Sequence, residues 1–144
     1  MVKPEEMVTF LAKVPLFQGL SKKQLKQLSN RFVPRSYGAG QAIVTQGKGG
    51  EGMFTIVSGN AEVIVETSDG TKNIVNEFGA MDFFGEVAML DDGPRTASVI
   101  TTEDTECLVL TRSDFVSLMQ GDPEMATEIA IALAKRLRRA VSTL

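Results

Sequence analysis

The spacing of apolar residues changes period twice along the chain and predicts helices at both ends with strands between them. Over residues 4–14, apolar side chains recur at every third or fourth position, which is the period of a helix. The same spacing over 21–32 predicts a second helix with Ser21 as its N-cap. Both segments precede the first β-branched run, so they form a helical lead.

Two more helix starts are marked towards the C-terminus. Helical spacing returns over 112–120, where Ser113 or Asp114 is the expected cap. A last helix is expected to begin at Asp122–Pro123 and to run to the C-terminus, because aspartate caps a helix and proline suits its first turn.

The region from Phe32 to Thr111 consists of short β-branched runs separated by glycine turns, into which roughly eight strands fit. The pairs Gly59-Asn60 and Asp69-Gly70 each predict a hairpin. The expected fold is therefore mainly β with flanking helices. It is an antiparallel β-barrel of the jelly-roll (double-stranded β-helix) type with N-terminal helices and a long C-terminal helix.

The length fits a single domain. A chain of 144 residues suits one core, and no repeat, low-complexity tract or linker divides it. We expect one domain over 1–144, made of a helical lead (1–31), a β-barrel (32–111) and C-terminal helices (112–144).

Composition excludes several kinds of chemistry. The sequence has no histidine and one cysteine, which rules out a histidine-based triad or general base and a metal site built from these ligands within one chain. A haem or iron–sulfur sensor and a cupin-like metalloenzyme of similar fold are disfavoured for the same reason. We therefore expect no enzyme activity, no catalytic residue and no metal.

Charge and cysteine usage indicate the environment of the chain. A net charge of −3 speaks against nucleic-acid or membrane binding by electrostatics, and no apolar run approaches the length of a membrane span. Cys107 has no cysteine partner in the sequence, and the N-terminus lacks the apolar stretch of a secretion signal. A cytoplasmic protein, or the cytoplasmic part of a larger one, is expected.

Residues 84–99, FGEVAMLDDGPRTASV, carry the most specific chemistry in the sequence. Gly85 permits a turn that other residues resist, and the short helix expected over 86–91 would present free N–H groups to an anion. Arg95 supplies a planar cation that suits phosphate, while an ionised Glu86 accepts hydrogen bonds from sugar hydroxyls. The pattern predicts a site with a phosphate end and a sugar end. An Arg95–Glu86 salt bridge without any ligand is the structural alternative.

This segment resembles the phosphate-binding cassette of cyclic nucleotide-binding domains, and the resemblance extends over nearly the whole chain. It implies that Arg95, helped by Thr96 and nearby backbone N–H groups, binds the cyclic phosphate, and that Glu86 binds the ribose 2′-hydroxyl. The ligand contacts implied in this way come from Phe84, Gly85, Glu86, Val87, Ala88, Arg95, Thr96 and Ala97. The loop GKGGEG (47–52) departs from the family pattern and is expected to lie outside the site. The expected ligand is cAMP rather than cGMP, although a hydroxyl at Thr96 can also reach a guanine amino group.

The last helix resembles the family's lid. Met125, Ile129, Leu133, Leu137 and Val141 share one face, which either covers the barrel or packs on the purine or on a second chain as a homodimer seam. Base or lid contacts are expected from Leu133, Arg136 and Leu137. The basic run over 135–139 is otherwise explained as a solvated helix end.

The expected function is that of a cyclic nucleotide-binding sensor, which relays ligand binding through its C-terminal helix to an output module absent from this sequence. The alternative is a ligand-free domain of the same fold that serves protein interaction or dimerisation. No membrane association and no specific nucleic-acid binding are expected of this chain alone.

Overall fold

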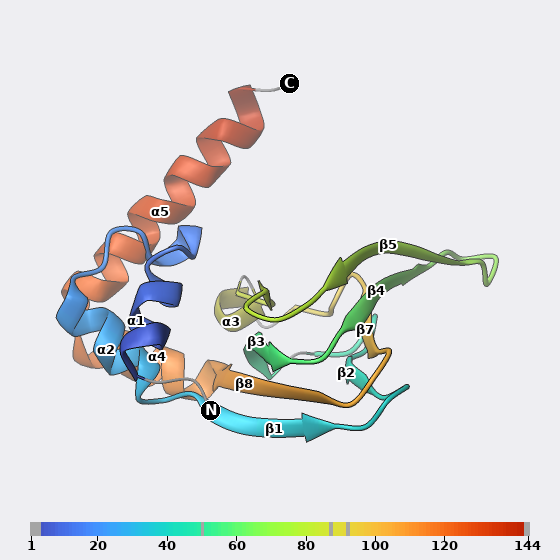
Figure 1. Ribbon diagram of the computed structural model, residues 1–144. Helices are drawn as coiled ribbons and strands as arrows, with labels where there is room; N and C mark the ends of the chain where they lie inside the picture. Colours follow the sequence, from blue (N-terminus) through green and yellow to red (C-terminus); the bar gives the residue numbers. More distant parts are fainter. Residues whose placement is uncertain (1–3, 50, 87, 92, 143–144) are drawn as a thin grey trace. The chain divides into compact units, whose positions relative to one another are not determined.

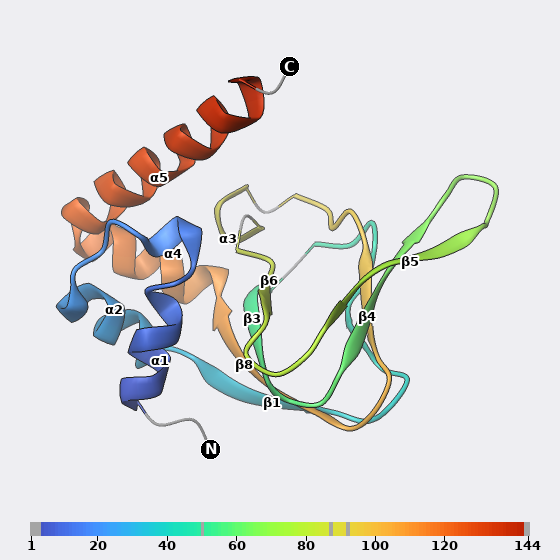
Figure 2. The same ribbon diagram turned by 45° about the horizontal axis from the view of Figure 1, so that its top comes forward.

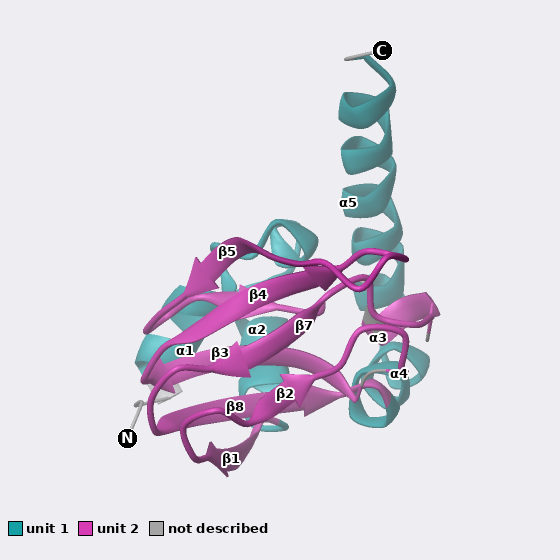
Figure 3. Cartoon of the chain, turned by 90° about the vertical axis from the view of Figure 1, so that its right-hand side faces the viewer, with its two compact units in different colours: residues 1–31, 113–144 teal, residues 32–112 magenta. Residues whose placement is uncertain are grey.

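The computed structural model describes residues 4–49, 51–86, 88–91 and 93–142, which fold into two compact units (Figure 3). Residues 32–112 form the strand unit, and the helical segments before and after them form the helical unit. The division follows the two changes in hydrophobic period along the sequence.

Two antiparallel sheets, each of four strands among the described residues, make up the strand unit (Figures 1 and 2). The strand order is β1-β8-β3-β6 in one sheet and β2-β7-β4-β5 in the other. The strands are β1 (Val33–Tyr37), β2 (Ala42–Val44), β3 (Gly52–Ser58), β4 (Ala61–Glu66), β5 (Lys72–Phe78), β6 (Phe83–Phe84), β7 (Ser98–Thr101) and β8 (Thr105–Thr111).

The two sheets share one hydrophobic core. Phe54, Ile56 and Val109 from the first sheet pack in the same cluster as Ala61 and Val99 from the second. Burying apolar side chains between two antiparallel sheets is the construction of a jelly roll. The expected fold, mainly β with flanking helices and a long C-terminal helix, is confirmed.

One of the two predicted hairpins is confirmed. β4 and β5 pair antiparallel from Ala61↔Phe78 to Glu66↔Lys72, with the Asp69-Gly70 turn between them. Gly70 has a φ of +88°, which glycine adopts without steric cost, and the Asp69 carboxylate accepts a hydrogen bond from the N–H of Thr71.

The second predicted hairpin is wrong, because the turn at Gly59-Asn60 carries the chain from one sheet to the other. β3 pairs with β6 and β8, whereas β4 pairs with β5 and β7. The Asn60 carbonyl accepts a hydrogen bond from the N–H of Thr102 at the corner between β7 and β8. A Cβ on Gly59 would overlap Thr105 in the same corner. The dipeptide predicted a turn, but long-range packing decided which strands pair.

The helical unit contains four α-helices among the described residues and one short 3-10 turn. They are α1 (Pro4–Leu11), η1 (Pro15–Phe17), α2 (Lys22–Ser29), α4 (Arg112–Gly121, whose first residue belongs to the strand unit) and α5 (Pro123–Ser142). The rings of Phe17 and Phe115, both buried, lie 6.1 Å apart between centroids and join η1 to α4.

Both N-terminal helices end earlier than predicted. α1 stops at Leu11 rather than at residue 14, because Val14 precedes a proline and takes an extended conformation (ψ of 121°). α2 stops at Ser29 rather than at residue 32, and Asn30 is its C-cap. The chain then enters β1, where Pro34 cannot continue a helix.

The cap of α2 is confirmed and is linked to the cap of α5. Ser21 accepts from the N–H of Gln24, and the Gln24 side chain accepts from the N–H of Ser21, which completes a capping box. The other end of the Gln24 side chain donates to Asp122 Oδ2 at 3.1 Å, while Asp122 Oδ1 accepts from the N–H of Met125. The predicted start of the last helix at Asp122–Pro123 is thereby confirmed, whereas α4 begins at Arg112, with Ser113 and Asp114 already inside its first turn.

The apolar face of α5 is divided along its length. Met125 and Ile129 are buried, but Leu137 is 66% exposed and Val141 is 58% exposed. The predicted continuous stripe is therefore buried only in the first half of the helix. No helix within the described residues is long and apolar enough to cross a membrane.

Candidate functional site

The cassette predicted over 84–99 connects β6 of one sheet to β7 of the other sheet. β6 ends at Phe84, the short helix α3 (Ala88–Asp91) follows, and the chain returns into β7 at Ser98. α3 is shorter than the helix predicted over 86–91. Residues 85 and 86 and residues 93–97 form the two connections, and these hold the charged and glycine residues singled out in the sequence.

Gly85 stands where only a glycine fits. Its φ of +85° lies in the left-handed region. A Cβ at this position would also overlap Nη1 of Arg95 and would lie 2.6 Å from the carbonyl oxygen of Gly52. The glycine therefore allows the arginine to pack directly on the backbone of the turn.

The backbone of Arg95 is held by the loop before β3. Its N–H donates to the carbonyl of Lys48 at 2.9 Å, and its carbonyl accepts from the N–H of Gly47 at 2.8 Å. Next to it, Pro94 forms an isolated antiparallel bridge with Gly49. These contacts fix where the arginine side chain starts.

The Arg95 side chain is half-buried and only partly bonded within the described protein. Nη2 donates to the main-chain carbonyl of Gly52 at 2.8 Å. Nε is buried and has no hydrogen-bond partner among the described residues. Buried donors are normally satisfied, so this donor is open to an acceptor outside the described residues.

Two opposing effects act on the charge of Arg95. Burial lowers its pKa, and the carboxylates of Glu86 and Asp91 favour the charged form and raise it. An arginine stays charged despite such a shift. The site therefore presents a cation, with a carboxylate that is close enough to interact with it.

A cavity of about 310 Å³ opens beside this arginine. Glu86, Asp91, Arg95 and Thr96 provide its charged and hydroxyl groups, and the rest of its wall is mostly apolar. The apolar wall consists of Val44, Val63, Phe78, Phe84, Pro94, Ala97 and Val99. A pocket of this size with a few polar groups on one side is typical of a small-molecule site.

The apolar wall is built on stacked aromatic rings. Phe84 stacks between Phe54 and Phe78, with ring centroids 5.3 Å and 5.0 Å apart and interplanar angles of 12° and 2°. Phe84 is only 8% exposed and belongs to the core shared by the two sheets. The apolar side of the cavity is thus anchored in the core through Phe84.

The structure brings most of the predicted contact residues together and leaves others apart. Phe84, Gly85, Glu86, Arg95, Thr96 and Ala97 all line the cavity, while Ala88 begins α3. Val87 lies outside the described residues. Leu133, Arg136 and Leu137 lie on α5 in the helical unit, so their contact with a ligand stays a prediction.

No described residue of the 47–52 loop lines the cavity, as predicted, but the loop does bond to Arg95. Gly47 and Lys48 hold the backbone of Arg95, and Gly52 holds its guanidinium. Main-chain N–H and carbonyl groups make these contacts, and they leave no trace in side-chain chemistry. The cluster of glycines in the loop was the available signal, because glycine marks close approach of backbones. The apolar residues Val44, Val63, Phe78 and Val99 were missed as well, because they follow an ordinary strand pattern.

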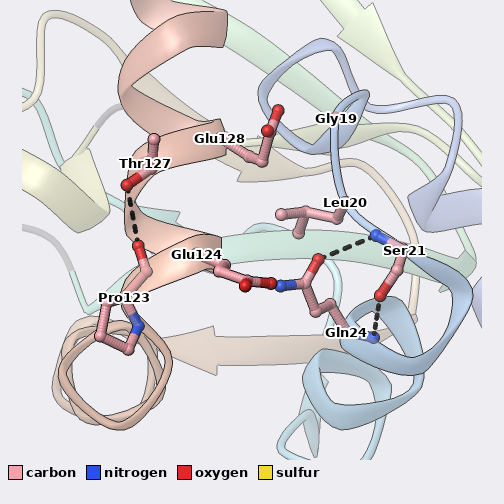
Figure 4. A pocket seen from close by; sticks show the side chains of 8 residues that line it. All are labelled: Gly19, Leu20, Ser21, Gln24, Pro123, Glu124, Thr127 and Glu128. Carbon is pink, nitrogen blue, oxygen red and sulfur yellow. Dashed lines mark hydrogen bonds between the residues drawn. The ribbon is translucent and has the colours of Figure 1, made fainter.

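A second cavity, of about 460 Å³, belongs to the helical unit (Figure 4). The capping residues Ser21 and Gln24 line one side, and Glu124, Thr127 and Glu128 of α5 line the other. Ser21 and Gln24 bond to each other, and Thr127 donates to the carbonyl of Pro123. This cavity is the larger of the two, but its polar groups serve helix ends, so we place the candidate site at the cassette.

No metal site accompanies either cavity within the part of the chain that is described. No group of three or more histidine, cysteine, aspartate or glutamate side chains there could hold a metal ion. The residues that line the cassette cavity can bind an anion next to a hydrogen-bonding group, over an apolar wall.

Comparison with known proteins agrees with this arrangement. The family model of the cyclic nucleotide-binding domain matches residues 34–122. The chain is 35% identical over 126 residues to the cyclic AMP receptor protein of Thermus thermophilus, covering 88% of this chain and 58% of that protein. It is 38% identical over 108 residues to the cAMP-dependent protein kinase regulatory subunit of Mycosarcoma maydis, covering 73% of this chain and 20% of that one.

Solved structures show the same fold. The N-terminal domain of a transcriptional regulator from Streptomyces coelicolor superposes with a TM-score of 0.85 at 26% identity, covering 94% of both chains. The catabolite activator protein of Thermus thermophilus superposes with a TM-score of 0.70 at 34% identity, covering 90% of this chain and 61% of that one. The chain thus spans less than two thirds of the length of the two curated relatives and of the catabolite activator protein. From the match over residues 34–122 and the identity to these relatives, the chain belongs to the cyclic nucleotide-binding domain family.

Proposed function

We propose that this chain is a sensor domain that binds a cyclic nucleotide, with cAMP preferred over cGMP, and has no catalytic activity of its own. Residues 1–144 would act as one such domain, with 84–99 as its phosphate-binding cassette. The observation that carries the proposal is the half-buried Arg95, whose buried Nε has no hydrogen-bond partner among the described residues and lies beside a cavity that Glu86 also lines.

Arg95 would bind the cyclic phosphate. A cyclic phosphodiester carries one negative charge, which one arginine can neutralise. The Gly52 carbonyl accepts from one hydrogen of Nη2, and Nε remains to donate a charge-assisted hydrogen bond to a phosphate oxygen. Thr96, together with N–H groups near Val87, Ala88 and Ala97, would complete the oxyanion contacts.

Glu86 would bind the sugar and the apolar wall would bind the base. An ionised carboxylate accepts from the ribose 2′-hydroxyl, and this contact would discriminate against 2′-deoxy ligands. Val44, Val63 and Phe78 would lie against the purine. The preference for cAMP is supported by relatives named as a cyclic AMP receptor and as cAMP-dependent kinase subunits, while Thr96 keeps cGMP as a competing ligand.

Ligand binding would be relayed through the C-terminal helix. Leu133, Arg136 and Leu137 of α5 would contact the base when the helix closes as a lid. The ligand would have to bind one helix position better than the other for any signal to arise. The output module would lie beyond this sequence, in line with relatives that are considerably longer than the chain.

The exposed face of α5 would form a homodimer with a second copy. Met125 and Ile129 are buried within the helical unit and are not available as a seam. Ala130, Ala134, Leu137 and Val141 are all exposed and follow one another at spacings of four, three and four, which suits a short two-helix seam.

Isothermal titration with cAMP and cGMP tests the binding proposal. The Arg95→Ala variant should bind at least about 100-fold more weakly, because it loses charge-assisted hydrogen bonds. Arg31→Ala is the matched control, since Arg31 is an exposed arginine ion-paired to Asp114 in the helical unit. Equal binding by the parent and Arg95→Ala would refute the site. Absence of binding to either nucleotide would favour the ligand-free interaction module.

A further inference from the structure

Asp91 lines the same cavity as Glu86 and Arg95, but the ligand contacts proposed above do not use it. It is the last residue of α3 and is exposed. An ionised carboxylate only accepts hydrogen bonds, so Asp91 has no donor to offer a phosphate. A negative charge at the wall of an anion site therefore needs an explanation of its own.

The local hydrogen bond of Asp91 does not require a charge. Its Oδ1 accepts from the N–H of Gly93 at 2.9 Å, which closes the turn that follows α3. Aspartate and asparagine both make this bond to the residue two positions on, because it needs only a side-chain oxygen. The turn therefore explains why the side chain is short and polar, but it does not explain why the side chain is a carboxylate.

The charges that line the cavity do not balance. Among the described residues, its ionisable side chains are those of Arg95, Glu86 and Asp91, so one cation faces two carboxylates. Burial lowers the pKa of Arg95, and Asp91 is one of the two carboxylates that raise it, so the charge of Asp91 acts on this arginine. By the same Coulomb law, Asp91 opposes any anion that Arg95 binds.

We infer that Asp91 is a specificity-determining residue, whose carboxylate makes the Arg95 site favour singly charged phosphodiesters over doubly charged phosphomonoesters. This inference rests on the proposed binding of a cyclic nucleotide at Arg95. A phosphomonoester such as 5′-AMP carries nearly two negative charges at neutral pH, because its second pKa is about 6, whereas the cyclic diester carries one. Since repulsion is proportional to the ligand's charge, Asp91 opposes the monoester about twice as strongly in free energy.

Asp91→Asn removes the charge and keeps the oxygen that accepts from Gly93. If that variant does not fold, Asp91→Ser takes its place, because a serine hydroxyl also accepts in such turns. Asp69→Asn is the matched control. Asp69 Oδ1 likewise accepts from the N–H two residues on, that of Thr71, at 3.0 Å, but Asp69 does not line the cavity. The two variants thus remove the same charge from the same kind of turn at different places.

The experiment is isothermal titration of the full chain with cAMP at neutral pH, followed by displacement of bound cAMP with 5′-AMP. Asp91→Asn should bind cAMP about threefold more tightly than the parent, which is within the range for one exposed charge pair. Its gain in affinity for 5′-AMP should be larger, about tenfold, because the same repulsion acts on about twice the charge. Asp69→Asn should bind both ligands as the parent does.

Unchanged binding by Asp91→Asn, equal gains for the two ligands, or the same gains in Asp69→Asn would each overturn the inference. It would also be overturned if 5′-AMP displaced no cAMP from Asp91→Asn, since another feature would then exclude the monoester. In all these cases the parent still binds cAMP, so the proposed function stands. If the parent binds neither cAMP nor cGMP, the proposed function fails and the role of Asp91 falls with it.

Discussion

Nη1 of Arg95 occupies the space in which a Cβ of residue 85 would stand, so Gly85 and the arginine are fitted to each other. The same turn has a φ of +85°. Two separate constraints, backbone conformation and crowding, therefore act on one glycine, and a matched pair of variants can separate them.

Gly85→Ala should lower the free energy of unfolding much more than Gly70→Ala does. Gly70 has nearly the same φ, +88°, but nothing lies within 4 Å of the position its Cβ would take. Gly70→Ala should cost about 1–2 kcal/mol of unfolding free energy from backbone strain alone. Gly85→Ala should cost more than this and should also weaken cAMP binding, because the guanidinium must move. Urea unfolding and titration measure the two effects, and equal costs would show that Gly85 is not crowded.

Replacing Glu86 should affect only ligands that carry a 2′-hydroxyl. Glu86→Gln should weaken cAMP binding by about 10- to 100-fold, the range for a hydrogen bond to a charged group. The same variant should bind 2′-deoxy-cAMP as well as the parent does, since that ligand has no hydroxyl to lose. Titrating both ligands into both proteins gives the four affinities that this comparison needs. If Glu86→Gln weakens both ligands equally, Glu86 acts through Arg95 rather than on the sugar.

Gln24 should be important for the stability of the helical unit. Its side chain accepts from Ser21 and donates to Asp122, so one amide joins the start of α2 to the start of α5. Gln24→Ala should lower the unfolding free energy by about 1–2 kcal/mol, because the capping box and the hydrogen bond to Asp122 are lost together. Gln27→Ala, an exposed glutamine in the same helix, should change it by less than about 0.5 kcal/mol. Thermal or urea unfolding tests the difference, and similar losses in both variants would contradict this role.

Cys107 should reduce stability at alkaline pH. Burial, with a smaller contribution from Glu106, raises the pKa of its thiol from 9.0 to about 11. Between these values the unfolded chain loses the proton that the folded chain keeps, so unfolding becomes easier as pH rises. Stability should therefore fall from pH 9 towards pH 11.

The control for this prediction is Cys107→Ala. It should be less stable at neutral pH, because it leaves a cavity in the shared core, but its stability should fall less steeply over the same range. Tyr37, whose pKa is also raised by burial, is present in both proteins and affects both alike. Unfolding in urea at several pH values gives the two slopes, and parallel slopes would show that the thiol ionises freely in the folded chain.

Local chemistry in the sequence was enough to predict much of the fold. Ser21 and Asp122 both cap the helices they were expected to cap, because capping depends on residues within one turn. Asp69-Gly70 forms its hairpin, since the two strands it joins are neighbours in one sheet. Gly59-Asn60 looks equally suitable, yet its strands belong to different sheets, and only packing against the β7–β8 corner decides this.

The candidate site likewise has one part that the sequence predicted and another that it did not. The charged groups and the glycine could be predicted from the sequence, because the arginine, the glutamate and the left-handed glycine of the cassette lie within eleven residues of one another, from Gly85 to Arg95. The groups that hold the arginine could be found only once the chain was folded. The contacts to Lys48 and Gly52 are made by main-chain carbonyls, which every residue possesses and no sequence pattern distinguishes. The apolar wall was decided in the same way, since Val44 and Phe78 come from the two edge strands of one sheet and Phe84 comes from the other sheet.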